Sequence, residues 1–412
     1  MSEEFSVITE KMIFGGYCIA KHNGKNIFVP YAIPGEKLKV KIVKTLKDYD
    51  LAQIVSIQEC SPHRCEPFCK LYTKCGGCNM QHIKNDYQIE LRKQMLKDCF
   101  EREGLTCPQI EVISGSEKNY RCRIQLTDGG FNEKESNKII DVDFCPVATE
   151  EINSYLSSTP TQNRPKGRVH FFGDKRLTKS KDEGFFNLMI ADESKNSTWE
   201  TKITGKKKPL KSKVKKRFMG TIQNEQNICK VNLCGKNIEF DVKGFFQSNM
   251  EVLEKTICEL KKNIGGTNLL DMYCGAGTLS AFVAESFKKT FLVEHNRDAL
   301  VHAEINIANT PHETYGLSGT KWVEQNADKI LLENGAFDAV IIDPPRSGME
   351  SAVCKWLCKN KAGIVKSLSC DPSTHARDAK YLVKSGYNLA KLYLLDFYPQ
   401  TSHIESLAYF ES

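Results

Sequence analysis

The residues best suited to covalent chemistry are a cysteine and a glutamate near the C-terminal end of the chain. Cys370 follows the apolar stretch GIVKSLS, so its sulfur is expected at the carboxyl end of a buried strand. Glu405 lies in SHIES, on a stretch expected to return toward the same edge. A thiolate can add to an electron-poor ring carbon, and a carboxylate can then remove a proton from the adduct. The alternatives are an ordinary buried thiol, in a chain with 17 cysteines, and a solvent-facing strand glutamate.

A second group of residues suits the binding of a nucleoside. In LLDMYCGAGTLS an acidic residue precedes Gly275 and Gly277, which would let the backbone approach a ligand closely, although a tight turn explains a glycine pair equally well. Acidic residues are expected to follow successive strands at Asp271, Glu294, Asp328 and Asp343. The GxGxxG fingerprint of a pyrophosphate site is missing. A nucleoside without phosphates, such as S-adenosylmethionine, therefore fits better than NAD or FAD.

A third group consists of clustered cysteines. Cys69, Cys75 and Cys78 have the spacing C-x5-C-x2-C, and Cys145 in DFCPV offers a fourth thiolate. Four thiolates are what an iron–sulfur cluster needs. Zinc also accepts four thiolates, but its structural sites favour paired C-x2-C spacings, which this chain does not show.

The elements that would position these residues follow from the hydrophobic pattern. From 268 onward short apolar runs alternate with helical segments, which predicts an α/β fold with a doubly wound parallel sheet. The last 26 residues, beginning YNLAKLYLL, indicate two strands joined by PQTSH, an antiparallel hairpin closing one edge of the sheet. Residues 13–57 alternate β-type runs with turn signals, as in a small β-barrel. A helix closed by Gly104 follows the cysteines, and 108–241 is expected to form a mixed, β-rich domain.

Charge and hydropathy exclude little about function. Lys and Arg number 58 against 51 Asp and Glu, a net charge of +7 that suits a polyanion but also occurs in proteins that bind none. The run from Lys206 to Arg217 is strongly basic and suits either phosphate contacts or a solvated loop. No apolar run approaches the roughly 20 residues that span a bilayer, and the acidic start lacks the order of a secretion signal. A cytoplasmic protein is expected.

Together the motifs carry a resemblance. GFFQSN, DMYCGAGT, VIIDPPRSG, SLSCDPSTHARD and PQTSHIES occur in the order typical of the RNA 5-methyluridine methyltransferases, and the chain resembles that family nearly end to end. The resemblance implies that Cys370 is the nucleophile toward uracil carbon-6 and Glu405 the proton acceptor. It implies that six residues contact S-adenosylmethionine: Gln247, Tyr273, Thr278, Glu294, Asp328 and Asp343. It also implies a [4Fe-4S] cluster on Cys69, Cys75, Cys78 and Cys145, with Cys60 and Cys65 outside the family pattern.

The resemblance also indicates an organisation and a substrate. Residues 1–58 look like a TRAM module, an OB-like barrel that binds RNA; 59–242 would carry the cluster, and 243–412 the Rossmann-like methyltransferase domain. Family members with both a TRAM module and a cluster typically act on 23S ribosomal RNA, so that substrate and a monomeric enzyme are expected, with transfer RNA as the alternative. One departure is Asp371, where the family usually has asparagine, because an ionised aspartate cannot donate the hydrogen bonds of an amide.

Two rival functions come from other classes. DPP also occurs in enzymes that methylate exocyclic amines, but an aromatic residue usually follows there, and Arg346 stands in its place. The other rival is a non-catalytic RNA-binding or redox-sensing iron–sulfur protein, which the presence of both Cys370 and Glu405 disfavours.

Overall fold

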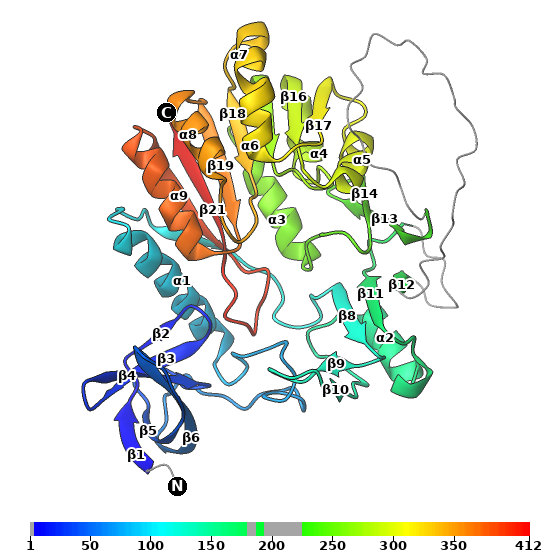
Figure 1. Ribbon diagram of the computed structural model, residues 1–412. Helices are drawn as coiled ribbons and strands as arrows, with labels where there is room; N and C mark the ends of the chain where they lie inside the picture. The colour runs from blue at the N-terminus through cyan, green and yellow to red at the C-terminus, as the bar shows by residue number, and fades with distance from the viewer. Residues whose placement is uncertain (1–3, 179–186, 193–224) are drawn as a thin grey trace.

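The computed structural model describes residues 4–178, 187–192 and 225–412 (Figure 1). The basic run Lys206–Arg217 lies outside these residues. Three regions follow one another along the chain: a small β-domain, a mixed middle region and a large α/β sheet that includes the C-terminus.

The first region is a single six-stranded sheet with strand order β1-β5-β6-β4-β3-β2. Its strands are β1 (Glu4–Ile8), β2 (Lys11–Ile13), β3 (Tyr17–His22), β4 (Lys25–Pro30), β5 (Lys37–Thr45) and β6 (Tyr49–Glu59). The alternation in KLKVKIV buries Leu38 and Val40 completely while the lysines between them stay at the surface side. Asn23 and Gly24 both have positive φ angles, as a two-residue hairpin turn between β3 and β4 requires. The predicted small β-domain is confirmed.

Helix α1 (Asn85–Arg102) connects this domain to the rest of the molecule (Figure 1). It buries Leu91, Met95, Leu96 and Phe100, which lie at helical spacing in the sequence. These residues belong to one hydrophobic core that continues from the β-domain into one face of the large sheet. The helix ends at Arg102, two residues before Gly104, whose φ of +78° suits a chain reversal, as the sequence predicted.

The middle region is mixed, as predicted. It contains the three-stranded sheet β12 (Leu188–Asp192)–β11 (Arg168–Gly173)–β8 (Arg123–Thr127), the pair β9 (Phe131–Asn132) and β10 (Ile139–Ile140), and the hairpin β13 (Ile228–Leu233)–β14 (Lys236–Asp241). Its helices are α2 (Glu150–Ser158) and the short 3-10 turns η1 (Thr161–Asn163) and η2 (Glu225–Asn227). Residues of β11, β13 and β14 pack in a second core on the other face of the large sheet.

The large sheet has the strand order β17-β16-β15-β18-β19-β21-β20-β7. Its strands are β15 (Gly266–Met272), β16 (Phe287–Val293), β17 (His312–Tyr315), β18 (Ala339–Ile342), β19 (Ile364–Ser369), β20 (Asn388–Leu395), β21 (Glu405–Glu411) and β7 (Ile110–Ile113). The helical segments around it are α3 (Met250–Leu260), α4 (Ser280–Val283), η3 (Ala284–Ser286), α5 (Arg297–Asn306), α6 (Gly319–Trp322), η4 (Val323–Ala327), α7 (Asp328–Asn334), α8 (Ser351–Lys359) and α9 (Pro372–Lys384). Among the described helices, none has the length and apolar character needed to cross a lipid bilayer.

The sheet is doubly wound, as predicted. Neighbouring residues such as Leu269 and Leu270 belong to different cores, so both faces are covered. From β15 the chain moves outward through β16 and β17 on one side and through β18 and β19 on the other. The carboxyl ends of β15 and β18 therefore form the switch point at which such sheets bind ligands.

One expectation about the sheet edge is wrong. The C-terminal strands β20 and β21 do form an antiparallel hairpin, but β21 lies between β19 and β20. The edge itself is β7, which pairs in parallel with β20, for example Val112 with Leu394. A four-residue strand more than 250 residues upstream carried too short a pattern to assign to this sheet.

Candidate active site

Strands β19 and β21 bring Cys370 and Glu405 to one place. The antiparallel register runs from Ile364 opposite Glu411 to Ser369 opposite Ser406. Continuing that register by one residue sets Cys370 opposite Glu405. Side chains directly opposite in such a pair point to the same face, with Cβ atoms about 4.5–5.5 Å apart. Glu405 is only 6% exposed, and Cys370 is half-buried. The solvent-facing alternative for Glu405 is therefore wrong.

The electrostatics of the pair suppress ionisation. Burial, and then the Asp343 carboxylate, raises the pKa of Glu405 to about 8, while the Arg346 guanidinium opposes this shift. Burial raises the pKa of Cys370 to about 11, with further contributions from Glu405 and Asp343, and Arg346 again acts in the opposite direction. Both groups are thus mainly protonated at pH 7, and any added positive charge nearby would favour their ionised forms.

The loop that leads into Glu405 is held from outside the sheet. The backbone N–H groups of Asn79 and Met80 both donate to the Gln400 carbonyl, at 3.1 and 3.0 Å. Gln400 has a φ of +71°, an uncommon conformation for a residue with a side chain. At the start of the loop, Arg92 of α1 forms a buried ion pair with Asp396, with 2.6 Å between Nη1 and Oδ1. Residues that follow the cysteine-rich segment thus hold the loop that leads into Glu405, which we call the catalytic loop.

Asp371 has a structural role that explains its side chain. It is the N-cap of α9, and its Oδ1 accepts hydrogen bonds from the backbone N–H groups of Ser373 and Thr374, at 3.0 and 2.9 Å. Aspartate and asparagine are about equally good at this position. Aspartate can therefore cap α9 as well as the asparagine that is usual in the family. About one helical turn further along α9, buried His375 shares a 2.7 Å hydrogen bond with the Ser406 hydroxyl, next to Glu405.

The predicted cofactor residues cluster at the switch point. Glu294 follows β16, and its carboxylate accepts hydrogen bonds from the N–H groups of Gly275, at 3.0 Å, and Asn296, at 2.6 Å. Asp271 in β15 is fully buried and accepts from the Ser280 hydroxyl, while its Oδ1 has no partner. Burial is the first cause that raises the Asp271 pKa to about 7. Asp343 follows β18, and burial followed by the Glu294 charge raises its pKa to about 6.

The two glycines of this loop have different roles. A Cβ atom on Gly277 would lie 2.9 Å from Ala303 of α5, so this glycine permits close helix packing. A Cβ on Gly275 would meet nothing within 4 Å, and its φ is +54°. Gly275 thus faces open space beside Glu294, as expected for backbone that a ligand approaches. Thr278 follows and is half-buried.

Tyr273 directly follows β15, whereas Gln247 lies in the loop before α3. The Gln247 side chain is 9% exposed, and its Oε1 has no partner. Its loop is anchored by Arg123, which donates to the carbonyls of Val242, at 2.9 Å, Gly244 and Phe246. Tyr273 has a φ of +65°, a strained conformation for a bulky residue that concentrates at functional sites. Its hydroxyl accepts from the Glu350 N–H at 3.1 Å.

These observations test whether the residues suit S-adenosylmethionine. Among the residues of this site that the structure describes, two buried oxygen acceptors have no hydrogen-bond partner, Gln247 Oε1 and Asp271 Oδ1, and each can take a hydrogen bond from an amino or hydroxyl group of a ligand. The carboxyl groups of Asp271, Glu294 and Asp343 are in electrostatic contact with one another, which favours a cationic ligand. The residues therefore fit a nucleoside that carries a positive charge.

Asp328 does not lie at the end of a strand, unlike Glu294 and Asp343. It is the exposed first residue of α7, whereas β17 ends at Tyr315. The residues that follow β17 are Gly316, Leu317 and Ser318, none of them acidic. The expectation of a strand-end carboxylate at Asp328 is wrong because a helical segment separates it from the strand.

The four clustered cysteines converge from two parts of the chain. Burial raises the pKa of the Cys75, Cys78 and Cys145 thiols, that of Cys78 to about 12. Cys69 contributes to the shifts of Cys75 and Cys145, so the four sulfurs lie within electrostatic reach of one another. In the part of the chain that the structure describes, however, no group of three or more His, Cys, Asp or Glu side chains is arranged to hold a metal ion. The [4Fe-4S] cluster stays a prediction.

The sequence did not single out two residues at the catalytic pair. Burial raises the Tyr398 pKa to about 12, and Glu405 and Cys370 add to the shift, which places the phenol near both. The Arg121 guanidinium lies 5.9 Å from the Tyr398 ring and also lowers the pKa of Cys75, Cys78 and Cys145. Arg121 thus stands between the cysteines and the catalytic pair, more than 240 residues from either reacting residue in sequence.

Comparisons with known proteins match this architecture. The tRNA (Uracil-5-)-methyltransferase family matches residues 84–412, and the TRAM domain matches 4–55. An uncharacterized RNA methyltransferase of Treponema denticola is 34% identical, covering 98% of each chain. A 23S rRNA (uracil(1939)-C(5))-methyltransferase of Aliivibrio fischeri is 27% identical over 100% of this chain and 97% of its own.

Among solved structures, the tRNA (uracil-54, C5)-methyltransferase of Pyrococcus abyssi, in complex with S-adenosyl-L-homocysteine, covers 98% of this chain and all of its own, with a TM-score of 0.69. At 23% identity, this similarity concerns the fold. The family match extends over most of the chain and includes every residue of the switch-point site and the catalytic pair. The chain belongs to the tRNA (Uracil-5-)-methyltransferase family and is an S-adenosylmethionine-dependent RNA uracil-5 methyltransferase.

Proposed function

We propose that the protein methylates carbon-5 of a uridine in 23S ribosomal RNA, with Cys370 as nucleophile and Glu405 as base. The observation that carries this proposal is that Cys370 directly follows β19 and Glu405 begins the paired strand β21, one residue beyond the last strand pair, Ser369 opposite Ser406, with Asp343 of the switch-point site in electrostatic contact with both. When bound, S-adenosylmethionine supplies an electrophilic methyl group and a positive charge that favours the ionised forms of the neighbouring acids.

Cys370 acts first because carbon-5 of uracil is a poor nucleophile by itself. The ionised sulfur adds to carbon-6, and the electron pair of the ring double bond moves toward carbon-5 and the carbonyl oxygen at carbon-4. Carbon-5 then takes the methyl group as the sulfur–methyl bond of the cofactor breaks, S-adenosylhomocysteine is the leaving group, and carbon-5 still holds its hydrogen. Glu405 removes that proton, the carbon-5–carbon-6 double bond re-forms, and the thiolate leaves. Arg346 favours both ionised groups in this cycle.

The substrate assignment is supported by similarity over the full length of the chain. The Aliivibrio fischeri relative, named for a 23S rRNA uracil, includes the TRAM region, which this chain also has. The matched family is itself named for transfer RNA, which makes transfer RNA the second candidate. The enzyme is proposed to act as a monomer, since a single chain supplies both reacting residues. It is proposed to act in the cytoplasm, since none of its 17 cysteines forms a disulfide bond.

We also propose the [4Fe-4S] cluster on Cys69, Cys75, Cys78 and Cys145. The support is the donor set: four cysteine sulfurs from two parts of the chain lie within electrostatic reach of one another, and four thiolates are what such a cluster requires. About four irons per chain and a brown colour after anaerobic purification are expected; stoichiometric zinc without visible absorption would contradict the cluster.

The mechanism is tested with two variants and one matched control. Cys370→Ala should lower methyl transfer by about 10³-fold or more while it keeps the affinity for S-adenosylhomocysteine. Cys358→Ala, which removes another half-buried thiol, should retain activity. Glu405→Gln should stop after methyl transfer and accumulate protein joined covalently to methylated RNA, seen as a gel shift that survives denaturation. If Cys370→Ala still makes 5-methyluridine at the wild-type rate, Cys370 is not the nucleophile; if the wild type labels an exocyclic amine instead of carbon-5, the proposed reaction itself is wrong.

The substrate is tested separately. Transcribed 23S ribosomal RNA and bulk transfer RNA are each incubated with labelled cofactor, and the labelled nucleoside is identified. Methylation of transfer RNA alone would overturn the ribosomal assignment without touching the mechanism.

A further inference from the structure

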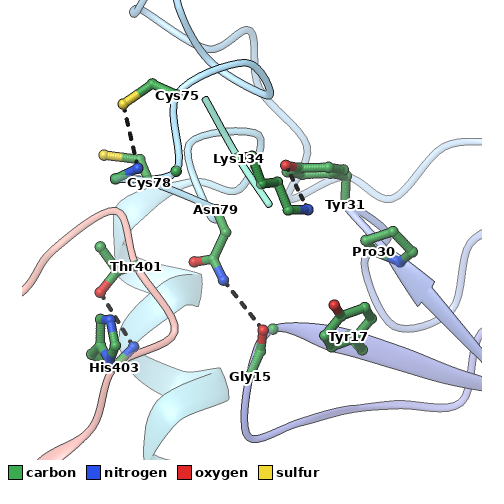
Figure 2. Close-up of a pocket in the computed structure, with 13 residues that line it drawn as sticks. Gly15, Tyr17, Pro30, Tyr31, Cys75, Cys78, Asn79, Lys134, Thr401 and His403 are labelled. Carbon is green, nitrogen blue, oxygen red and sulfur yellow. Dashed lines mark hydrogen bonds between the residues drawn. The ribbon is translucent and has the colours of Figure 1, made fainter. Parts of the chain in front are cut away.

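A cavity of about 110 Å³ opens where the β-domain, the cysteine-rich loop and the catalytic loop meet (Figure 2). Cys75 and Cys78, two of the proposed cluster ligands, form its third wall, so a ligand in the cavity would lie beside the cluster. Figure 2 shows Tyr17, Pro30 and Tyr31 on the side of the β-domain, and Thr401 and His403 on the side of the catalytic loop. Such a volume is well below the roughly 300–1,000 Å³ of a drug-sized ligand site. It therefore has room for a single planar ring or a single phosphate.

The β-domain side offers aromatic faces and a cation. The Lys134 Nζ lies 4.5 Å from the centre of the Tyr31 ring and donates to the Tyr31 hydroxyl at 3.1 Å. Tyr31 has a φ of +61°, an uncommon conformation for a bulky residue. Tyr17 is half-buried at the start of β3. Tyrosine rings stack nucleobases, and a lysine ammonium binds phosphate.

The catalytic side connects the cavity to the reacting residues. His403 lies two residues before Glu405, so along the chain the two are separated by at most about 7 Å. Partial desolvation and the guanidinium groups of Arg346 and Arg121 lower the pKa of His403, which places those positive charges beside the cavity. Positive charge of this kind attracts a polyanion to the space between the catalytic pair and the β-domain.

The walls of the cavity are held in place without a ligand. Asn79 donates from Nδ2 to the Gly15 carbonyl, at 3.3 Å, and to the Ser402 hydroxyl, at 2.9 Å, while its Oδ1 accepts from the Ser402 N–H at 2.8 Å. Gly16 makes this approach possible: its φ is +83°, and a Cβ there would lie 2.7 Å from Asn79 Nδ2. One side chain thus joins all three walls, and Figure 2 shows its hydrogen bond to Gly15.

We propose that this cavity is a subsite for the base of one nucleotide neighbouring the target uridine, with the base against Tyr17 and the phosphate of that nucleotide outside the cavity, toward Lys134. This inference rests on the proposed function, because it assumes that the target uridine lies at Cys370 and Glu405 and that the RNA strand continues from there into the cavity. It assigns to the β-domain a contact with the nucleotide next to the reacting base, so that this domain takes part in choosing the uridine as well as in general affinity.

The test measures RNA affinity with 23S ribosomal RNA and bulk transfer RNA as probes. Tyr17→Ala should weaken binding of the preferred RNA by about tenfold or more, the loss expected for one base stacked on an aromatic ring. Tyr17→Phe keeps the ring and should bind within about twofold of the wild type. Lys134→Gln should reduce the slope of log affinity against log salt by about one, and Lys134→Arg should restore it.

Affinity for S-adenosylhomocysteine is measured for every variant and should not change. If Tyr17→Ala fails to fold, the lysine pair decides the question through the salt slope alone. Wild-type affinity and salt slope in both Tyr17→Ala and Lys134→Gln would overturn the subsite. Failure of the wild type to bind or methylate either RNA would instead overturn the proposed function.

Discussion

Gln88 and Gln400 exchange a reciprocal pair of hydrogen bonds: Gln88 Nε2 donates to Gln400 Oε1 at 2.9 Å, and the Gln400 backbone N–H donates to Gln88 Oε1 at 3.0 Å. Both side chains are buried. A residue at the first turn of α1 thus determines the backbone of the loop that carries Glu405.

Gln88→Ala should therefore lower both stability and turnover. Leaving buried groups without partners costs about 1–3 kcal/mol, and the loop before Glu405 loses its fixed geometry. The Kd for S-adenosylhomocysteine should stay unchanged, because that site lies on other strands. Gln94→Ala, on an exposed position of the same helix, is the control. Equal turnover in the two variants would show that the loop holds its position without Gln88.

The raised pKa of Glu405 makes stability depend on pH. The folded protein retains this proton up to about pH 8, whereas an unfolded glutamate releases it near its ordinary value of 4.5. The folded state thus binds more protons in this window, and its stability falls as pH rises from about 5 to 8. Glu405→Gln carries no such charge, so its melting temperature should exceed that of the wild type by a few degrees at pH 8 and by less at pH 5. A constant difference across this range would contradict the buried carboxyl.

Arg346 should set the pH dependence of the rate. Its guanidinium lowers the pKa of both Cys370 and Glu405, so Arg346→Gln should raise both and move the rising limb of the pH–rate profile to higher pH. The shift should be less than about one unit, because Arg346 is exposed and screened by salt. Arg346→Lys should return most of it. A lower rate at every pH without a shift would assign Arg346 to substrate binding instead.

Asp371 should behave as a helix cap. Asp371→Asn should change the free energy of unfolding by only a few tenths of a kcal/mol, whereas Asp371→Ala should cost about 1 kcal/mol through loss of the hydrogen bonds to Ser373 and Thr374. Denaturant unfolding measures both. A large loss in the asparagine variant would mean that the charge itself is required.

Gly275 and Gly277 should separate ligand binding from folding. Gly277→Ala places a methyl group 2.9 Å from Ala303 and should lower stability by about 1–3 kcal/mol. Gly275→Ala meets no neighbour, so its cost to stability should be limited to the backbone strain of about 1 kcal/mol, while affinity for S-adenosylhomocysteine should fall. Unchanged affinity in Gly275→Ala would mean that the ligand does not approach this backbone.

The sequence predicted the parts of this molecule that depend on local patterns. Glu294 and Asp343 follow buried apolar runs, and the ends of parallel strands meet at one edge, so periodicity alone placed them. The prediction for Asp328 was wrong because this residue begins a polar helix, α7, and does not follow a strand. Arg121, Tyr398 and the Asn79 contacts depend on chain segments that meet only in three dimensions, and no local pattern indicates such meetings.

Strand β7 gives this enzyme a particular order of assembly. It is synthesised early, yet its partner β20 is among the last segments to leave the ribosome. The early strand must wait for nearly the whole remaining chain, so the sheet is a slow, non-local structure to complete. A fragment that begins at residue 243 would leave the edge of β20 bare and prone to pair with other chains. Gene fusions or truncations that treat the C-terminal region as a portable unit should therefore retain residues 110–113.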